Sequence, residues 1–146
     1  MTSQTETSST ELAQGMRRSV MRLARRLRQM HEESLGLTQN QLSLLGLLTG
    51  SGPRSVGELA ELEKVQPPAI TRTVKALEQL GLVQRSADPD DGRRAVVEVT
   101  PRGREIVLAD RRRRDLWLVE RLGELTPAER ELLGRASVLL QRLADS

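Results

Sequence analysis

The chain has 146 residues, which is about the length of one domain with a hydrophobic core of its own. It contains no Phe, no Tyr and one Trp, so its core must be aliphatic, which favours helices over strands. The absence of Cys excludes disulfide bonds, thiol redox sensing and thiolate metal sites. The net charge is only +3, and no stretch approaches the ~20 apolar residues of a membrane span. We therefore expect a cytoplasmic protein that does not enter a membrane.

The first predicted element is a long amphipathic helix. Residues 1–10 are polar and rich in Ser and Thr, which predicts a disordered N-terminal tip. Over residues 11–35 the apolar side chains recur every three or four positions, the spacing of one helical stripe. They are Leu12, Met16, Val20, Leu23, Leu27 and Met30. The other faces carry arginines over residues 17–28, which could bind a membrane surface or a partner helix, but a solvated or acid-paired face is favoured.

Three shorter helices follow, each with a recognisable start. Thr38 with Gln41, and Ser55 with Glu58, have capping-box spacing and begin the second and third helices. Pro67 and Pro68 fit only the first turn of a helix, so the fourth helix begins there and runs to about Leu80, before Gly81. The side chains predicted to face inward from the third and fourth helices are Leu59, Leu62, Ile70, Val74, Leu77 and Leu80.

A β-hairpin and two further helices complete the chain. Residues 82–85 and 95–99 are short strand-like runs joined by a segment rich in Pro, Asp and Gly. Thr100-Pro101 begins a fifth helix that continues to Gly123, and Thr126 with Glu129 forms a capping box for the last helix. The apolar face of that last helix comprises Leu132, Leu133, Ala136, Leu139, Leu140 and Leu143. The expected fold is therefore mainly α with a small β-hairpin wing, a winged helix-turn-helix.

The fourth helix has the two faces that a DNA-reading helix needs. An apolar back fixes its orientation on the protein, and Thr71, Arg72 and Lys75 form a front of donors for bases and phosphates. Arg72 is suited to bidentate pairing with guanine, and Gln66 lies at the helix start, where the dipole favours phosphate. Taken alone, such a front is more often an ordinary solvated helix face.

The hairpin strengthens the DNA-binding interpretation. Arg93 lies at the apex of the turn, where a long planar cation can reach a narrow minor groove. Asp91, two residues earlier, could pair with Arg93 and hold the apex in shape. The alternatives are a surface turn of mixed charge and a calcium loop, but the spacing of the aspartates does not match an EF-hand.

Several segments in this order resemble the MarR (multiple antibiotic resistance regulator) family. They are Ser55–Ala60, Pro68–Arg72, Leu77–Val83, Asp88–Arg93, Val97–Thr100 and Gly103. The resemblance implies an obligate homodimer that regulates transcription, usually as a repressor relieved by a small molecule. It assigns the recognition-helix arginine to Arg72 and the wing Asp-x-Arg to Asp91 and Arg93. Arg94 departs from the small residue commoner in such wings, so we expect the wing to bind additional phosphate.

These arguments assign the domains and the DNA-binding residues. Residues 36–104 form the winged helix-turn-helix, residues 105–123 connect it, and residues 11–35 and 124–146 are dimerisation helices after the tip at 1–10. The predicted partner is pseudo-palindromic double-stranded DNA. The predicted contacts are Ser55, Gln66, Pro68, Thr71, Arg72, Lys75, Asp91, Arg93 and Arg94.

The apolar faces at the two ends of the chain predict the dimer independently of the resemblance. A small wing domain cannot bury both, so they should pair with each other and with a symmetry mate. The predicted dimerisation residues are Leu12, Met16, Val20, Leu132, Ala136, Leu139 and Leu143. The alternative is that both faces cover a single monomeric core.

No enzyme is expected, because the chain has no phosphate-binding or dinucleotide-binding glycine motif and a single His, which cannot build a His-rich metal site. We expect no cofactor and no metal. The resemblance implies a small anionic or aromatic effector, for which Arg17, His31 and Arg112 are weak candidates, although His31 is more often a cap or packing residue. The rival functions are a nonspecific nucleoid protein and a protein-interaction module that kept the fold without DNA binding.

Overall fold

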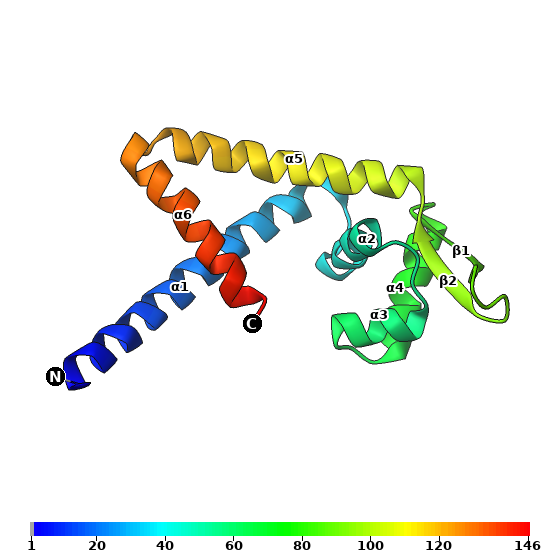
Figure 1. Cartoon of the computed structure of the whole chain (residues 1–146). Helices are drawn as coiled ribbons and strands as arrows, with labels where there is room; N and C mark the ends of the chain where they lie inside the picture. Colours follow the sequence, from blue (N-terminus) through cyan, green and yellow to red (C-terminus); the bar gives the residue numbers. More distant parts are fainter. Residues whose placement is uncertain (1) are drawn as a thin grey trace. The chain divides into compact units, whose positions relative to one another are not determined.

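The computed structural model describes the backbone of residues 2–146 and the side chains of residues 8–30 and 36–146. It is mostly helical, with one antiparallel hairpin (Figure 1). In chain order the elements are α1 (Thr2–Leu35), α2 (Gln39–Ser51), α3 (Val56–Glu63), α4 (Pro67–Gln79), β1 (Val83–Ala87), β2 (Ala95–Val99), α5 (Pro101–Gly123) and α6 (Pro127–Ala144). The chain divides into two compact units, residues 1–110 and 111–146.

Helix α1 begins earlier than the sequence predicted. It starts at Thr2 rather than near residue 11, so residues 2–10, expected to form a disordered tip, have helical backbone. Ser and Thr lower helix propensity only modestly, and each residue added to an existing helix gains a backbone hydrogen bond. Along the predicted apolar stripe, Leu12, Val20 and Leu23 are exposed, whereas Met16 and Leu27 are half-buried.

The core lies in the winged-helix region and is aliphatic, as the composition predicted. Thr38 caps α2 with a complete capping box, and α2 contributes Leu44, Leu45 and Leu48, each at most 1% exposed. The same buried cluster includes Leu59 of α3, Val97 of β2 and Val107 of α5. With Ile70, Val74 and Leu77 of α4, four helices and the hairpin share one core, which fixes the helix-turn-helix against the wing.

Two leucines predicted to face inward are exposed. Leu59 of α3 is fully buried, but Leu62 is 54% exposed, and Ala60 is the second buried residue of the helix. The buried face of this two-turn helix is centred between residues 59 and 60, which turns residue 62 away. Leu80, predicted at the buried end of α4, is 47% exposed because it is already the C-cap residue of that helix.

The turn between α3 and α4 ends α3 abruptly. Lys64, the C-cap of α3, has a left-handed backbone conformation with φ of 54°, and its amide donates to the carbonyls of Ala60 and Glu61. Pro67 and Pro68 then open α4, whose buried residues are Ile70, Val74 and Leu77. This short turn brings two helices into one helix-turn-helix.

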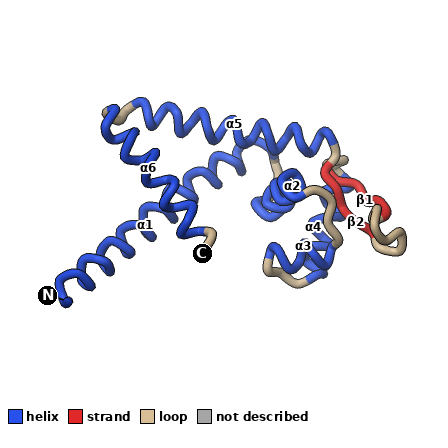
Figure 2. The backbone as a smooth tube through the Cα atoms, viewed as in Figure 1, coloured by secondary structure: helices blue, strands red, loops and turns tan. Residues whose placement is uncertain are grey.

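The wing is a two-stranded hairpin with an added bridge (Figure 2). Strands β1 and β2 are antiparallel, with Val83 opposite Val99 and Ala87 opposite Ala95. Arg54, just before α3, pairs with Val97 through two backbone hydrogen bonds of 3.0 and 2.7 Å. The segment leading into α3 is thus attached to the outer edge of β2.

The base of the wing is held against the start of α5. The amide of Thr100 donates to the carbonyl of Leu82, and its hydroxyl donates to the carbonyl of Gly81. A Cβ at Gly103 would lie 2.2 Å from the Leu82 carbonyl oxygen, so only glycine fits at this position. The hairpin consequently emerges from a closely packed junction.

The second unit, residues 111–146, comprises the last part of α5 and the whole of α6. Thr126 caps α6 with a complete capping box, as predicted. No residue of α6 is buried, and its leucines stand 39–64% exposed. Among the described residues, no helix has the length and apolar character needed to span a bilayer.

Candidate nucleic-acid interface

The front of α4 presents the three predicted side chains to solvent. Thr71, Arg72 and Lys75 are exposed, on the side opposite to the buried residues of the helix. Within the described part of the chain, neither Arg72 nor Lys75 forms an ion pair. The Thr71 hydroxyl donates to the Pro67 carbonyl at 3.1 Å, which leaves its methyl group and oxygen lone pairs accessible. Two cations are therefore available to an external anion on a fixed helix face.

The start of α4 offers fewer backbone donors than an ordinary helix. Pro67 and Pro68 have no N–H, and the amide of Ala69 donates to the Gln66 carbonyl at 3.0 Å. Gln66, the N-cap, makes no side-chain capping hydrogen bond and is exposed. The expectation that the helix dipole favours phosphate here is thus weakened, and recognition at this end depends on side chains.

The tip of the wing has a defined backbone conformation. The amide of Asp88 donates to the carbonyl of Arg94 at 2.8 Å, and the amide of Arg94 donates to the carbonyl of Asp91 at 3.0 Å. The Asp91 carboxylate accepts from the backbone amide of Arg93 at 3.1 Å rather than from its guanidinium. Asp91 therefore shapes the turn, as proposed from the sequence, but through the backbone, and the Arg93 side chain remains exposed.

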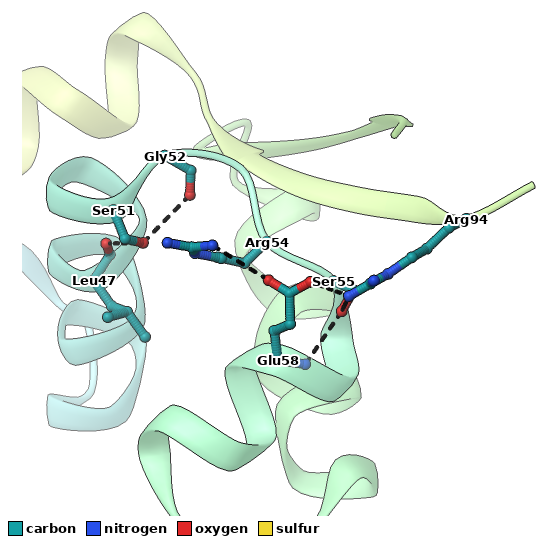
Figure 3. A network of polar contacts seen from close by, with 7 residues as sticks. All are labelled: Leu47, Ser51, Gly52, Arg54, Ser55, Glu58 and Arg94. Atoms are coloured by element: carbon teal, nitrogen blue, oxygen red, sulfur yellow. Dashed lines mark hydrogen bonds and ion pairs between the residues drawn. The ribbon is translucent and has the colours of Figure 1, made fainter. Parts of the chain in front are cut away.

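Arg94 and Ser55, predicted as DNA contacts, form hydrogen bonds within the chain, although Arg94 is exposed and only Ser55 is buried. The Arg94 guanidinium donates to the Ser55 hydroxyl at 2.5 Å and forms an ion pair with Glu58 (Figure 3). Ser55 is 8% exposed and also accepts from the Glu58 amide as the N-cap of α3. Arg94 therefore has a hydroxyl and a carboxylate of its own chain as partners, and the additional phosphate contact expected of it stays a prediction.

Sequence reasoning missed the role of Glu58. The spacing of Ser55 and Glu58 predicted a reciprocal capping box, but only the serine half forms. The Glu58 carboxylate instead lies between the guanidinium groups of Arg54 and Arg94, its Oε2 3.5 Å from Arg54 Nη1 (Figure 3). The two arginines are 40 residues apart in sequence, so no local sequence pattern could predict that they meet at Glu58.

A third ion pair, also missed, joins α4 to the wing. Arg85 Nε lies 2.6 Å from the Glu78 carboxylate, linking the last turn of α4 to β1. Arg85 lies two residues after the buried Val83 and is exposed, and nothing in the local sequence pairs it with Glu78. The orientation of the hairpin relative to α4 is thus held by a charged contact as well as by the core.

The residues of the other predicted sites are divided between the two compact units. The predicted dimerisation residues of α6 are exposed, Leu132 by 59%, Leu139 by 51% and Leu143 by 64%, while Ala136 is half-buried. Of the effector candidates, Arg17 and Arg112 are exposed and belong to different compact units, and the side chain of His31 lies outside the described residues.

Comparison with known proteins agrees with this architecture. Residues 37–95 match the MarR family. An uncharacterized HTH-type transcriptional regulator of Mycobacterium bovis is 41% identical over 138 residues, covering 94% of this chain and 96% of the relative.

Solved structures share the fold over nearly the whole chain. A crystal structure of a protein from Pseudomonas aeruginosa, described as a transcriptional regulator, superposes with a TM-score of 0.84 at 33% identity and covers 95% of this chain and 97% of that one. A mutant of Staphylococcus aureus MepR bound to an oligodeoxyribonucleotide has a TM-score of 0.68 at 21% identity, covering 90% and 97%. With this helix-turn-helix, wing and extent of identity, the chain belongs to the MarR family of HTH-type transcriptional regulators.

Proposed function

We propose that the protein is a homodimeric repressor that binds a pseudo-palindromic operator and releases it in response to a small molecule. Each subunit places α4 in a major groove and Arg93 in the flanking minor groove, with half-sites about one helical turn apart. The observation that carries the proposal is the front of α4. Arg72 and Lys75 are exposed and without an ion pair in the described part of the chain, on a helix whose back is fully buried.

The positions of Arg72, Lys75 and Arg93 suit them to different groups of the DNA, which supports recognition of a specific base sequence. Arg72 lies one turn into α4, where a guanidinium can donate two hydrogen bonds to guanine. Lys75 lies almost one turn later and is suited to phosphate, which positions the helix without reading sequence. Arg93 extends from a turn whose backbone Asp91 holds, so the point from which its cation reaches toward a narrow groove is fixed.

The exposed leucines of α6 support the proposed dimer. A helix with no buried residue and a continuous stripe of exposed leucines is not stable on propensity alone. A two-fold axis pairs such a stripe with its own copy, and it also spaces two α4 helices for a palindromic site. Repression and response to an anionic or aromatic effector follow from the family resemblance, and Arg17, His31 and Arg112 stay candidates for the effector site.

The first experiment is selection of bound fragments from the genome of the producing organism, followed by titration of the strongest site. Arg72→Ala should weaken binding to that site by ~1–3 kcal/mol and relax the preference at one base position. Arg142→Ala, which removes an exposed arginine of α6, is the matched control and should leave affinity unchanged. Equal weakening on every sequence would make Arg72 a phosphate contact instead.

The spacing of half-sites tests the dimer on DNA. Inserting about five base pairs between the half-sites rotates one of them to the opposite face of the duplex and should abolish tight binding. Affinity that ignores the spacing, or that depends on salt without any preferred sequence, would contradict the proposal and favour a nonspecific DNA-binding protein. Absence of any salt-sensitive DNA affinity would favour a protein-interaction role.

A further inference from the structure

Glu58 connects three parts of the winged-helix unit, defined as residues 36–110. It lies in the first turn of α3, three residues after the N-cap Ser55. Its carboxylate accepts from Arg94, the residue just before β2, and pairs with Arg54, the residue just before the N-cap of α3. One acid thus binds two arginines that enter from different directions (Figure 3).

Both arginines are attached to the same strand. Arg94 precedes the first residue of β2, and Arg54 exchanges two backbone hydrogen bonds with Val97 in the middle of β2. Holding both guanidinium groups therefore ties the start and the middle of β2 to the first turn of α3. Ser55 reinforces this connection because its hydroxyl accepts from Arg94 at 2.5 Å and from the Glu58 amide at 3.2 Å.

This connection orients the wing relative to the recognition helix. Leu59, one residue after Glu58, is fully buried in the cluster that also holds Ile70 and Val74 of α4. Helix α3 is consequently a rigid support shared by the wing root and α4. Arg94 is also adjacent in sequence to Arg93, so fixing Arg94 limits where the Arg93 side chain can reach.

The charge of Glu58 makes this role testable. A carboxylate in a DNA-binding unit repels phosphate, and its removal should by itself strengthen binding. Glu58, Arg54 and Arg94 together carry a net charge of +1 in place of the +2 of the arginines alone. An acid that only lowers the local positive charge would oppose DNA binding, whereas an acid that orients the wing would assist it.

We propose that Glu58 is a positioning residue for DNA binding, which holds Arg94 and Arg54 so that the wing presents Arg93 to the minor groove. The inference rests on the proposed DNA-binding function. In this proposal Arg94 supports the wing instead of binding phosphate. Glu58, although negatively charged, raises the affinity for DNA.

The first test is Glu58→Gln, titrated on the selected operator at several salt concentrations. Positioning predicts binding weakened about fivefold, which is the effect of losing ~1 kcal/mol of orientation. It also predicts a weaker preference for A/T-rich flanks, where Arg93 acts. Tighter binding of Glu58→Gln to the operator would overturn the proposal, because it would show that the carboxylate acts only through its charge.

Glu61→Gln is the matched control. Glu61 lies in the same helix, is exposed, and lines the same hollow as Glu58 and Arg94, but it has no ion pair in the part of the chain that the structure describes. Its neutralisation should leave affinity unchanged or raise it slightly. A loss of affinity equal to that of Glu58→Gln would overturn the proposal, since both variants would then act through a shared effect on α3.

Arg94→Ala supplies a second readout that does not depend on the stability of α3. A residue that contacts phosphate adds about one to the slope of log Kd against log salt concentration, whereas a residue held by Glu58 adds nothing. We expect Arg94→Ala to weaken operator binding by about fivefold with an unchanged slope, and Arg94→Lys to recover part of the loss. A slope reduced by about one would place Arg94 on phosphate and overturn the proposal.

Coupling to Arg93 completes the test. In the Arg93→Ala background, Glu58→Gln and Arg94→Ala should cause no additional weakening, because the side chain that they position is gone. Fully additive losses would contradict positioning. If the wild-type protein shows no sequence-preferring DNA binding, the proposed function fails. If wild type and Arg93→Ala behave as expected while Glu58→Gln tightens binding, only the role of Glu58 fails.

Discussion

The two compact units have similar aliphatic helices but bury them very differently. The described residues from 36 to 110 include all those that are buried, and several leucines of α2, α3 and α4 are at most 1% exposed. In residues 111–146 no residue is buried, although α6 has as many leucines as α2. The same residue type therefore builds an internal core in one unit and an uncovered face in the other.

The difference shows that hydrophobic periodicity indicates which face is apolar but not what covers it. The winged-helix unit is a closed set of helices and strands, so its apolar faces meet within one chain. Residues 111–146 contain only the end of α5 and the helix α6, and two helices are too few to enclose a core. We therefore expect the winged-helix unit to respond to mutations as a folded core does, and α6 to respond as an interface does.

The largest effect is expected from a charge placed in the exposed leucine stripe of α6. Leu139→Glu would bury two unpaired carboxylates in a two-fold interface, at about 3–5 kcal/mol for each. Sedimentation velocity should then find a dimer for the wild type and a monomer for the variant. Leu62→Glu, at a leucine of similar exposure in α3, is the control and should stay dimeric. A dimer that survives Leu139→Glu would place the interface elsewhere.

The next largest effect is expected when a side chain in the core of the winged-helix unit is shortened. Leu59→Ala should lower the free energy of unfolding by ~2–5 kcal/mol, because Leu59 is fully buried and its removal leaves a cavity. Leu62→Ala, three residues later in the same helix, should change it by less than ~0.5 kcal/mol. Urea denaturation followed by circular dichroism measures both. Equal losses would mean that Leu62 is covered in solution.

A medium effect is expected at the junction between the wing and α5. Gly103→Ala should lower the free energy of unfolding by ~1–3 kcal/mol, because its Cβ would meet the Leu82 carbonyl oxygen and Val99. Gly46→Ala in α2 meets no atom within 4 Å and should raise it by ~0.5–1 kcal/mol through helix propensity. Opposite signs in thermal melts are the expected result, and a stabilised Gly103→Ala protein would contradict the close packing.

The smallest effect is expected in the turn of the helix-turn-helix. Lys64→Gly should raise the free energy of unfolding by about 0.5 kcal/mol, because glycine adopts the left-handed conformation without the steric cost paid by a side chain. Lys64→Ala removes the same charge without relieving the strain and should give no gain. If both variants were equally stabilised, the cause would be charge rather than backbone conformation.

Much of this structure could be predicted because its signals are local. Capping at Thr38 and Thr126, the proline start of α4 and the buried stripe of Ile70, Val74 and Leu77 each depend on residues within a few positions of one another. The exposed front of α4 followed from the same periodicity. Two strand-like runs and the segment between them predicted the wing, and Asp91 was predicted to shape its tip, which agrees with the hydrogen bond that its carboxylate accepts from the Arg93 amide. Family resemblance assigned the Asp-x-Arg of the wing to Asp91 and Arg93.

What the sequence pattern missed depends on how the elements pack against one another. Leu62 has helical spacing from Leu59 but lies beyond the edge of a short buried face. Arg94 was read as a free cation of the wing, yet a carboxylate 36 residues earlier binds it. By itself the sequence determined the helices, the turn and which face of α4 is exposed, because backbone hydrogen bonding and periodicity act over a few residues. Tertiary structure alone decided which charges remain free for DNA, because an ion pair depends on where distant segments meet.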